Sequence, residues 1–60
     1  MDQTTKDRVK QHLQSIAILA VNTQQAMDDE DLEEAADLLE SIDHDIDMIR
    51  KIGRELLEQE

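Results

Sequence analysis

Apolar residues recur at alternating spacings of four and three along two long stretches of this 60-residue chain. The first stretch contains Val9, Leu13, Ile16, Ala20, Thr23 and Met27, in which only Thr23 is polar. The second contains Leu32, Ala35, Leu39, Ile42, Ile46, Ile49, Gly53 and Leu56. This spacing places one residue after another on the same side of an α-helix. The pattern therefore predicts two helices, over about residues 5–27 and about residues 32–58.

The boundaries of these helices are predicted from capping residues, because the chain has no proline and a single glycine. Thr4 followed by Asp7 resembles a capping box and predicts that the first helix begins near Thr5. Asp31 followed by Glu34 forms the best cap for the second helix. Residues 28–31 between the helices are then a turn.

The two apolar stripes come into register when the chain folds back at this turn. Met27 then lies opposite Leu32, Ala20 opposite Leu39, and Leu13 opposite Ile46. We therefore expect an all-α fold in which residues 1–60 form one domain, an antiparallel helical hairpin. The rival interpretation of the run "IAILAV", residues 16–21, as a buried strand fails because no second strand is present to pair with it.

The apolar surface is wider than one neighbouring helix can cover. Leu19, Ala26, Leu38 and Ile52 lie beside the two stripes. A second hairpin packed on this surface would complete a four-helix bundle, so we expect a homodimer. The expected core and dimer interface consist of Val9, Leu13, Ile16, Leu19, Ala20, Leu32, Leu38, Leu39, Ile42, Ile46, Ile49, Ile52 and Leu56.

Two apolar residues, Ile18 and Val21, fall on the outside of the first helix. Singly exposed apolar residues are common on soluble proteins. Alternatively, the pair belongs to a docking surface with its polar neighbours. The candidate partner-binding residues are Gln11, Gln14, Ile18, Val21, Asn22 and Gln25.

Gly53 occupies a core position, where glycine is about 1 kcal/mol less favourable than alanine in a helix. The register places Gly53 opposite Lys6. The glycine therefore either leaves room for the aliphatic stem of Lys6 or marks a frayed last turn.

Charge is distributed unevenly along the chain. Residues 1–27 carry three cations and two acids, whereas residues 28–60 carry three cations and fourteen acids. An acidic surface disfavours nucleic-acid backbones and anionic lipid, so we expect a basic protein partner. The chain has no cysteine and no apolar run near the length of a membrane span, which predicts a soluble, cytoplasmic protein without membrane association.

Residues with catalytic or metal-binding chemistry are few and dispersed. Glu40 and His44 are only two exposed candidate ligands. Residues 29–40 superficially match a calcium loop, but Glu34 stands where that loop needs glycine. His12 borders the apolar stripe without a neighbouring nucleophile and orienting acid. We therefore expect no enzymatic activity, no catalytic residues, no metal site and no cofactor.

The second half of the chain resembles the Rop (repressor of primer) family in the pattern "D..E.AD..ES.....D", residues 31–47. The resemblance in heptad layout extends over nearly the whole chain. It implies a hairpin that dimerises into an antiparallel four-helix bundle and binds paired RNA stem-loops. Aligned without a gap, the RNA-contacting Asn, Phe, Gln and Lys of that family fall on Gln11, Ser15, Leu19 and Ala26, of which only Gln11 is chemically similar.

The sequence thus predicts a small acidic regulatory or adaptor module. It self-associates and binds another protein through a face of the helical bundle. The alternative function is Rop-like binding of structured RNA through the first helix.

Overall fold

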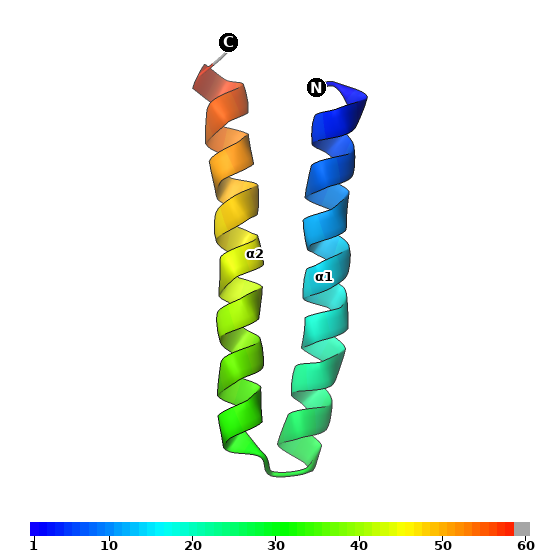
Figure 1. Ribbon diagram of the computed structural model, residues 1–60, viewed down its shortest axis with the longest axis vertical. Helices are drawn as coiled ribbons and strands as arrows, with labels where there is room; N and C mark the ends of the chain where they lie inside the picture. Colours follow the sequence, from blue (N-terminus) through cyan, green and yellow to red (C-terminus); the bar gives the residue numbers. More distant parts are fainter. Residues whose placement is uncertain (59–60) are drawn as a thin grey trace.

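The computed structural model describes residues 1–58, which form a helical hairpin (Figure 1). Helix α1 spans Gln3–Asp28 and helix α2 spans Leu32–Glu58. The helices run side by side in opposite directions, with the N-terminus beside the end of α2 and the turn at the other end. This arrangement confirms the all-α antiparallel hairpin.

Helix α1 begins earlier than the sequence predicts, because Asp2 and not Thr4 is its N-cap. The side chain of Asp2 accepts a hydrogen bond from the backbone N–H of Thr5 at 2.7 Å. A carboxylate at this position satisfies an unpaired N–H group and interacts favourably with the helix dipole. Helix α1 therefore includes Gln3 and Thr4, and the predicted start near Thr5 is wrong.

The turn follows a Schellman motif that leads directly into the cap of α2. The N–H of Asp31 donates to the carbonyl of Ala26 at 2.9 Å, and the N–H of Glu30 donates to the carbonyl of Met27 at 3.0 Å. Glu30 has a positive φ of 58°, the left-handed conformation that closes this motif. Asp31 then accepts a hydrogen bond from the N–H of Glu34 at 3.1 Å, which confirms Asp31 as the cap of α2.

The contact between the helices, here called the seam, is rotated relative to the predicted one. Ala26, Ala35 and Ile52 are the buried apolar residues, although the sequence placed Ala26 and Ile52 beside the stripe. Leu13 and Leu39, predicted to face the opposite helix, are 51% and 52% exposed. The seam consists of Val9, His12, Ile16, Leu19, Thr23 and Ala26 on α1 and Ala35, Leu38, Ile42, Asp45, Ile49, Ile52 and Leu56 on α2.

The residues of the predicted pairs Leu13/Ile46, Ala20/Leu39 and Met27/Leu32 therefore lie at the edge of the contact and not in the buried core. Five of these six residues come directly after a seam residue in the sequence, and Leu32 lies one helical turn before the seam residue Ala35. All six are therefore at the edge of the contact between the helices. The predicted row and the observed seam both keep the alternating spacing of four and three. The spacing alone therefore does not show which of the two rows is buried. The hairpin measures 46 × 17 × 9 Å across its Cα atoms, which makes it a layer one helix thick.

Candidate interaction surfaces and a buried polar cluster

One side of the hairpin exposes a row of apolar side chains, here called the apolar face. All but one of these residues lie four positions after a seam residue of the same helix. The exception, Leu32, extends the row on α2 toward the turn. In an antiparallel helix pair this position falls on the same side of both helices. Leu32 is 66% exposed, and Met27 is 52% exposed. The apolar face consists of Leu13, Ala20 and Met27 on α1 and Leu32, Leu39 and Ile46 on α2.

The opposite side of the hairpin is mainly polar. Its residues lie at the other edge of the contact between the helices, and each of them comes one position before a seam residue. These residues are Arg8, Ser15 and Asn22 on α1 and Glu34, Ser41, Met48 and Glu55 on α2, with Met48 as the apolar exception. The hairpin is therefore amphipathic across its width, and one of its two broad sides is suited to apolar packing.

The six candidate partner-binding residues lie on the side of α1 away from α2, here called the outer face, with one of them, Asn22, at its border with the polar side. They are Gln11, Gln14, Ile18, Val21, Asn22 and Gln25, and all of them are exposed. Ile18 and Val21 are each 64% exposed. No Lys, Arg, Asp or Glu occurs anywhere in residues 11–27. The outward positions of α2, in contrast, include Asp37, Glu40, Asp47, Lys51 and Arg54.

A polar cluster joins the two helices at mid-length. Asp45 on α2 is 8% exposed and accepts hydrogen bonds at both carboxylate oxygens. The hydroxyl of Ser15 donates to Oδ2 at 2.7 Å, and Nδ1 of His12 lies 2.8 Å from Oδ1. An ionised carboxylate only accepts, so the proton of His12 in this pair lies on Nδ1. Both oxygens of the buried acid are thus satisfied, which makes its burial tolerable.

The hydrogen bonds of this cluster lower the pKa of Asp45 below the usual 3.8. The bond from His12 is the largest cause, and the bond from Ser15 is the next; burial opposes both. The pKa of Asp2 is lowered as well, chiefly by the backbone N–H of Thr5. Both carboxylates are therefore held in the ionised form by donors at specific positions.

Sequence reasoning missed this cluster because it placed every acid outside the seam. A signal was present in the spacing: Asp45 lies seven residues from Leu38 and from Ile52, in the middle of a buried row. His12 likewise lies seven residues before Leu19. In chemical terms the arrangement is not a catalytic triad, because the acid and not the histidine contacts the serine.

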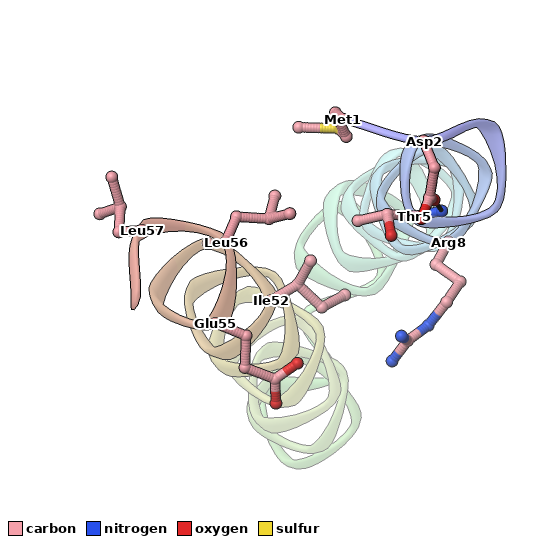
Figure 2. Close-up of a pocket in the computed structure, with 9 residues that line it drawn as sticks. Met1, Asp2, Thr5, Arg8, Ile52, Glu55, Leu56 and Leu57 are labelled. Atoms are coloured by element: carbon pink, nitrogen blue, oxygen red, sulfur yellow. Dashed lines mark hydrogen bonds between the residues drawn. The ribbon is translucent and has the colours of Figure 1, made fainter. Parts of the chain in front are cut away.

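The open end of the hairpin contains a cleft of about 830 Å³ between the first turns of α1 and the last turns of α2 (Figure 2). Ile52 and Leu56 project from α2 toward α1 in this region. A side-chain carbon built on Gly53 at the edge of the cleft would have no atom within 4 Å. Gly53 therefore does not make room for the stem of Lys6, and that interpretation is corrected. The nine lining residues are Met1, Asp2, Thr5, Arg8, Ile52, Gly53, Glu55, Leu56 and Leu57.

Charge is separated along the length of the hairpin. All six cations lie toward the open end, three in residues 6–10 and three in residues 50–54. Residues 28–40, at the turn and in the first turns of α2, contain eight acids and no cation. One end of the hairpin is therefore strongly negative, whereas the other carries charges of both signs.

Metal ligands do not converge in the described part of the chain. Within residues 1–58 no group of three or more His, Asp or Glu side chains is arranged to hold a metal ion. Neither helix of this region has the length and apolar character needed to cross a membrane.

The positions that correspond to RNA-contacting residues of the Rop family are mostly turned toward α2. Ser15 is bonded to Asp45, Leu19 is half-buried and Ala26 is buried, which leaves Gln11 on the outside. The hairpin architecture itself agrees with that resemblance. No protein-family model matches the chain, and no curated protein or solved structure matches it significantly.

Proposed function

We propose that this protein is a non-enzymatic acidic regulatory or adaptor module that acts by binding proteins, and that two copies join through their apolar faces into a four-helix bundle. The observation that carries the proposal is the apolar face. Leu13, Met27 and Leu39 are each about half exposed, and they are aligned on one side of a hairpin only one helix thick. An aligned apolar row of this kind is typical of an interface.

Burial argues for the same assembly. Ala26, Ala35 and Ile52 are the apolar side chains that the hairpin buries below a tenth of their surface. A chain of this size usually needs additional stabilisation beyond its own core. The chain contains no cysteine, so a disulfide does not supply that stabilisation. Packing a second copy on the apolar face does supply it, at roughly 25 cal/mol for each Å² of apolar surface removed from water.

The charge separation favours one sense of pairing. When the two hairpins run head to tail, the acidic turn of one lies beside the cations of the open end of the other. When they run side by side in the same sense, two strongly negative turns are adjacent. Coulomb repulsion between the turns opposes the second arrangement. We therefore include head-to-tail pairing in the proposed dimer.

The protein partner of this bundle is proposed to be basic. Eight acids in residues 28–40 create a negative surface around the turn and the start of α2. Such a surface accelerates the approach of a cationic partner and contributes to its selection. Binding should weaken as salt is added, because ions screen exposed charges. A partner affinity that is unchanged between low and high salt would contradict the basic partner.

Light scattering over a dilution series tests the dimer. The wild-type chain should have the mass of a dimer that dissociates on dilution, and Leu39→Glu should be monomeric under the same conditions. Leu39→Glu places a charge in the proposed interface, where desolvation opposes burial. Ile18→Glu is the matched control, because it makes the same kind of change on the outer face and should preserve the dimer. A wild-type monomer at every concentration would overturn the proposal.

Binding of structured RNA through α1 remains the second candidate. Lys6, Arg8 and Lys10 are exposed and close together in the sequence, and a dimer would present two copies of them. Such a patch attracts phosphate, and its binding should fall steeply with salt. A gel shift with a labelled structured RNA at low salt tests this candidate. Lys10→Gln should weaken a real complex, whereas an absent shift would remove RNA from consideration.

A further inference from the structure

The outer face of α1 is unexplained by the proposed dimer and by a basic partner. It lies on the side of α1 away from the seam, and it carries no charge that would attract a cation. Residues 16–21 are apolar on three sides of the helix: Ile16 and Leu19 face α2, Ala20 lies on the apolar face, and Ile18 and Val21 lie on the outer face. An apolar stripe on a helix typically packs against another element.

Four residues of the outer face form a row along the helix whose order, with side chains classed as glutamine or apolar, reads the same in both directions. The face presents glutamine, an apolar residue, an apolar residue and glutamine, at positions 14, 18, 21 and 25. Positions 18 and 21 are equidistant from the centre of this row, and so are positions 14 and 25. A two-fold axis through the centre therefore places Ile18 of one copy against Val21 of another, and Gln14 against Gln25.

The flanking charges agree with this symmetry. Two antiparallel α1 helices paired about the same axis bring Arg8 of one copy near Asp29 of the other, on the same edge of the contact. Both residues are exposed. Nearer to the axis, the uncharged and exposed Asn22 lies on that edge. Opposite charges thus face each other at the ends of the contact, and uncharged groups fill its middle.

From these observations we infer that the outer face of α1 is a second self-association surface, whose occupant is the outer face of another copy in antiparallel orientation. Two bundles are joined through it, so that the protein assembles beyond the dimer. This inference extends the proposed function, but its surface is separate from the apolar face. Its small apolar area, two side chains from each copy, makes the contact weaker than the apolar-face contact.

Sedimentation at increasing concentration tests the inference. The average mass of the wild-type protein should rise above that of a dimer at high concentration. Ile18→Glu should stop the rise at the dimer and weaken the second association by at least about tenfold. Ile18→Ser combined with Val21→Ser should do the same without adding charge. Circular dichroism of each variant establishes that the hairpin remains folded.

Charge substitutions at the glutamines test the antiparallel register. In Gln14→Glu combined with Gln25→Lys, the introduced glutamate of each copy faces the introduced lysine of the other, so the second association should strengthen. In Gln14→Lys combined with Gln25→Lys, like charges face each other and the association should weaken, although the chain as a whole becomes less negative. The opposite order of these two variants would overturn the register.

Repeating the sedimentation experiment with Leu39→Glu distinguishes the two self-association surfaces, because this substitution prevents association through the apolar face. If the inference is correct, this variant, which is monomeric in the dilution series, forms a weak dimer through the outer face at the higher concentrations used for sedimentation. Adding Ile18→Glu abolishes that dimer. A wild-type mass that stays at the dimer up to millimolar concentrations overturns the inference and leaves the proposed function intact. A mass that rises above the dimer equally in wild type and Ile18→Glu also overturns it.

Discussion

At the scale of single residues, the carboxylate of Asp45 is the polar connection between the helices. It accepts from His12 and Ser15, both on α1, at the centre of a seam that is otherwise largely apolar. Removing one of the three side chains leaves a buried polar group without a hydrogen-bond partner. The resulting loss of folding free energy is larger than the net contribution of the hydrogen bond itself. Asp45→Ala should therefore lower the melting temperature. Replacing all three residues by apolar ones should recover much of the loss.

The pH dependence of stability should reveal the ionised form of Asp45. The folded-state pKa of this residue lies below the usual 3.8, so its contribution is present above that pH and is lost as the pH falls through the folded pKa. Wild type should be more stable than Asp45→Asn near neutral pH, and the difference should shrink below pH 3.8. Asp2 also has a lowered pKa, but it is present in both proteins and cancels. Denaturation curves at several pH values measure this difference, and a gap that widens as the pH falls below 3.8 would contradict the assignment.

Gly53 offers a stabilising substitution. Nothing lies within 4 Å of the position that a side-chain carbon would occupy, and the residue is inside α2. Gly53→Ala should therefore increase the free energy of unfolding by about 0.5–1 kcal/mol, the difference in helix propensity. Chemical denaturation of the two proteins at equal concentration measures it. Destabilisation would show that the glycine is required for a close contact, such as one with a second copy.

At the scale of the helices, the seam and the apolar face should respond differently to truncation. Ile52 is 3% exposed in the hairpin, so Ile52→Ala should destabilise it by about 2 kcal/mol or more at every protein concentration. Leu39 is 52% exposed, and Leu39→Ala should act mainly by weakening the dimer. Its effect on the melting temperature should therefore grow with protein concentration above the dissociation constant. An effect of Leu39→Ala that is equal at all concentrations would place this side chain in the hairpin core.

The same comparison explains which parts of the fold the sequence predicts. Helix content, the turn and the Asp31 cap follow from local patterns and agree with the structure. The rotation of the helices does not follow, because two neighbouring rows on each helix have acceptable spacing. The row through Leu13 and Ile46 contains no charge, whereas the row through His12 and Asp45 does, so hydrophobicity favours the first. The seam nevertheless contains Asp45, hydrogen-bonded to His12 and Ser15, and such pairing between distant residues is not visible in the local pattern.

The outer face could be predicted from the sequence, whereas the apolar face could not. The outward position of Ile18 and Val21 follows from helical periodicity alone, since it depends only on α1. The apolar face depends on the rotation of both helices, and therefore becomes evident only when the seam is known. Leu19, Leu38 and Ile52 were expected at the edge of the core but line the seam itself.

At the scale of the whole molecule, the head-to-tail dimer predicts which cysteine pairs form disulfides. Met27 lies at the turn end of the apolar face, and Gly53 lies beside the open end. In head-to-tail pairing, a chain with Met27→Cys should cross-link to a chain with Gly53→Cys when the two are mixed and oxidised. Gly53→Cys alone should cross-link poorly to itself. Gel electrophoresis without reductant distinguishes the species, and efficient Gly53→Cys self-linkage would indicate pairing in the same sense.

The thinness of the hairpin also has a consequence for how the protein would persist in a cell. A slab 9 Å deep across its Cα atoms buries few side chains, so we expect a solitary subunit to open more readily, and to be cleaved more readily by proteases, than an associated one. If association supplies the missing shielding, survival depends on how many copies are present. Degradation would then be fast at low abundance and slow at high abundance, and the protein's own expression level would set its lifetime.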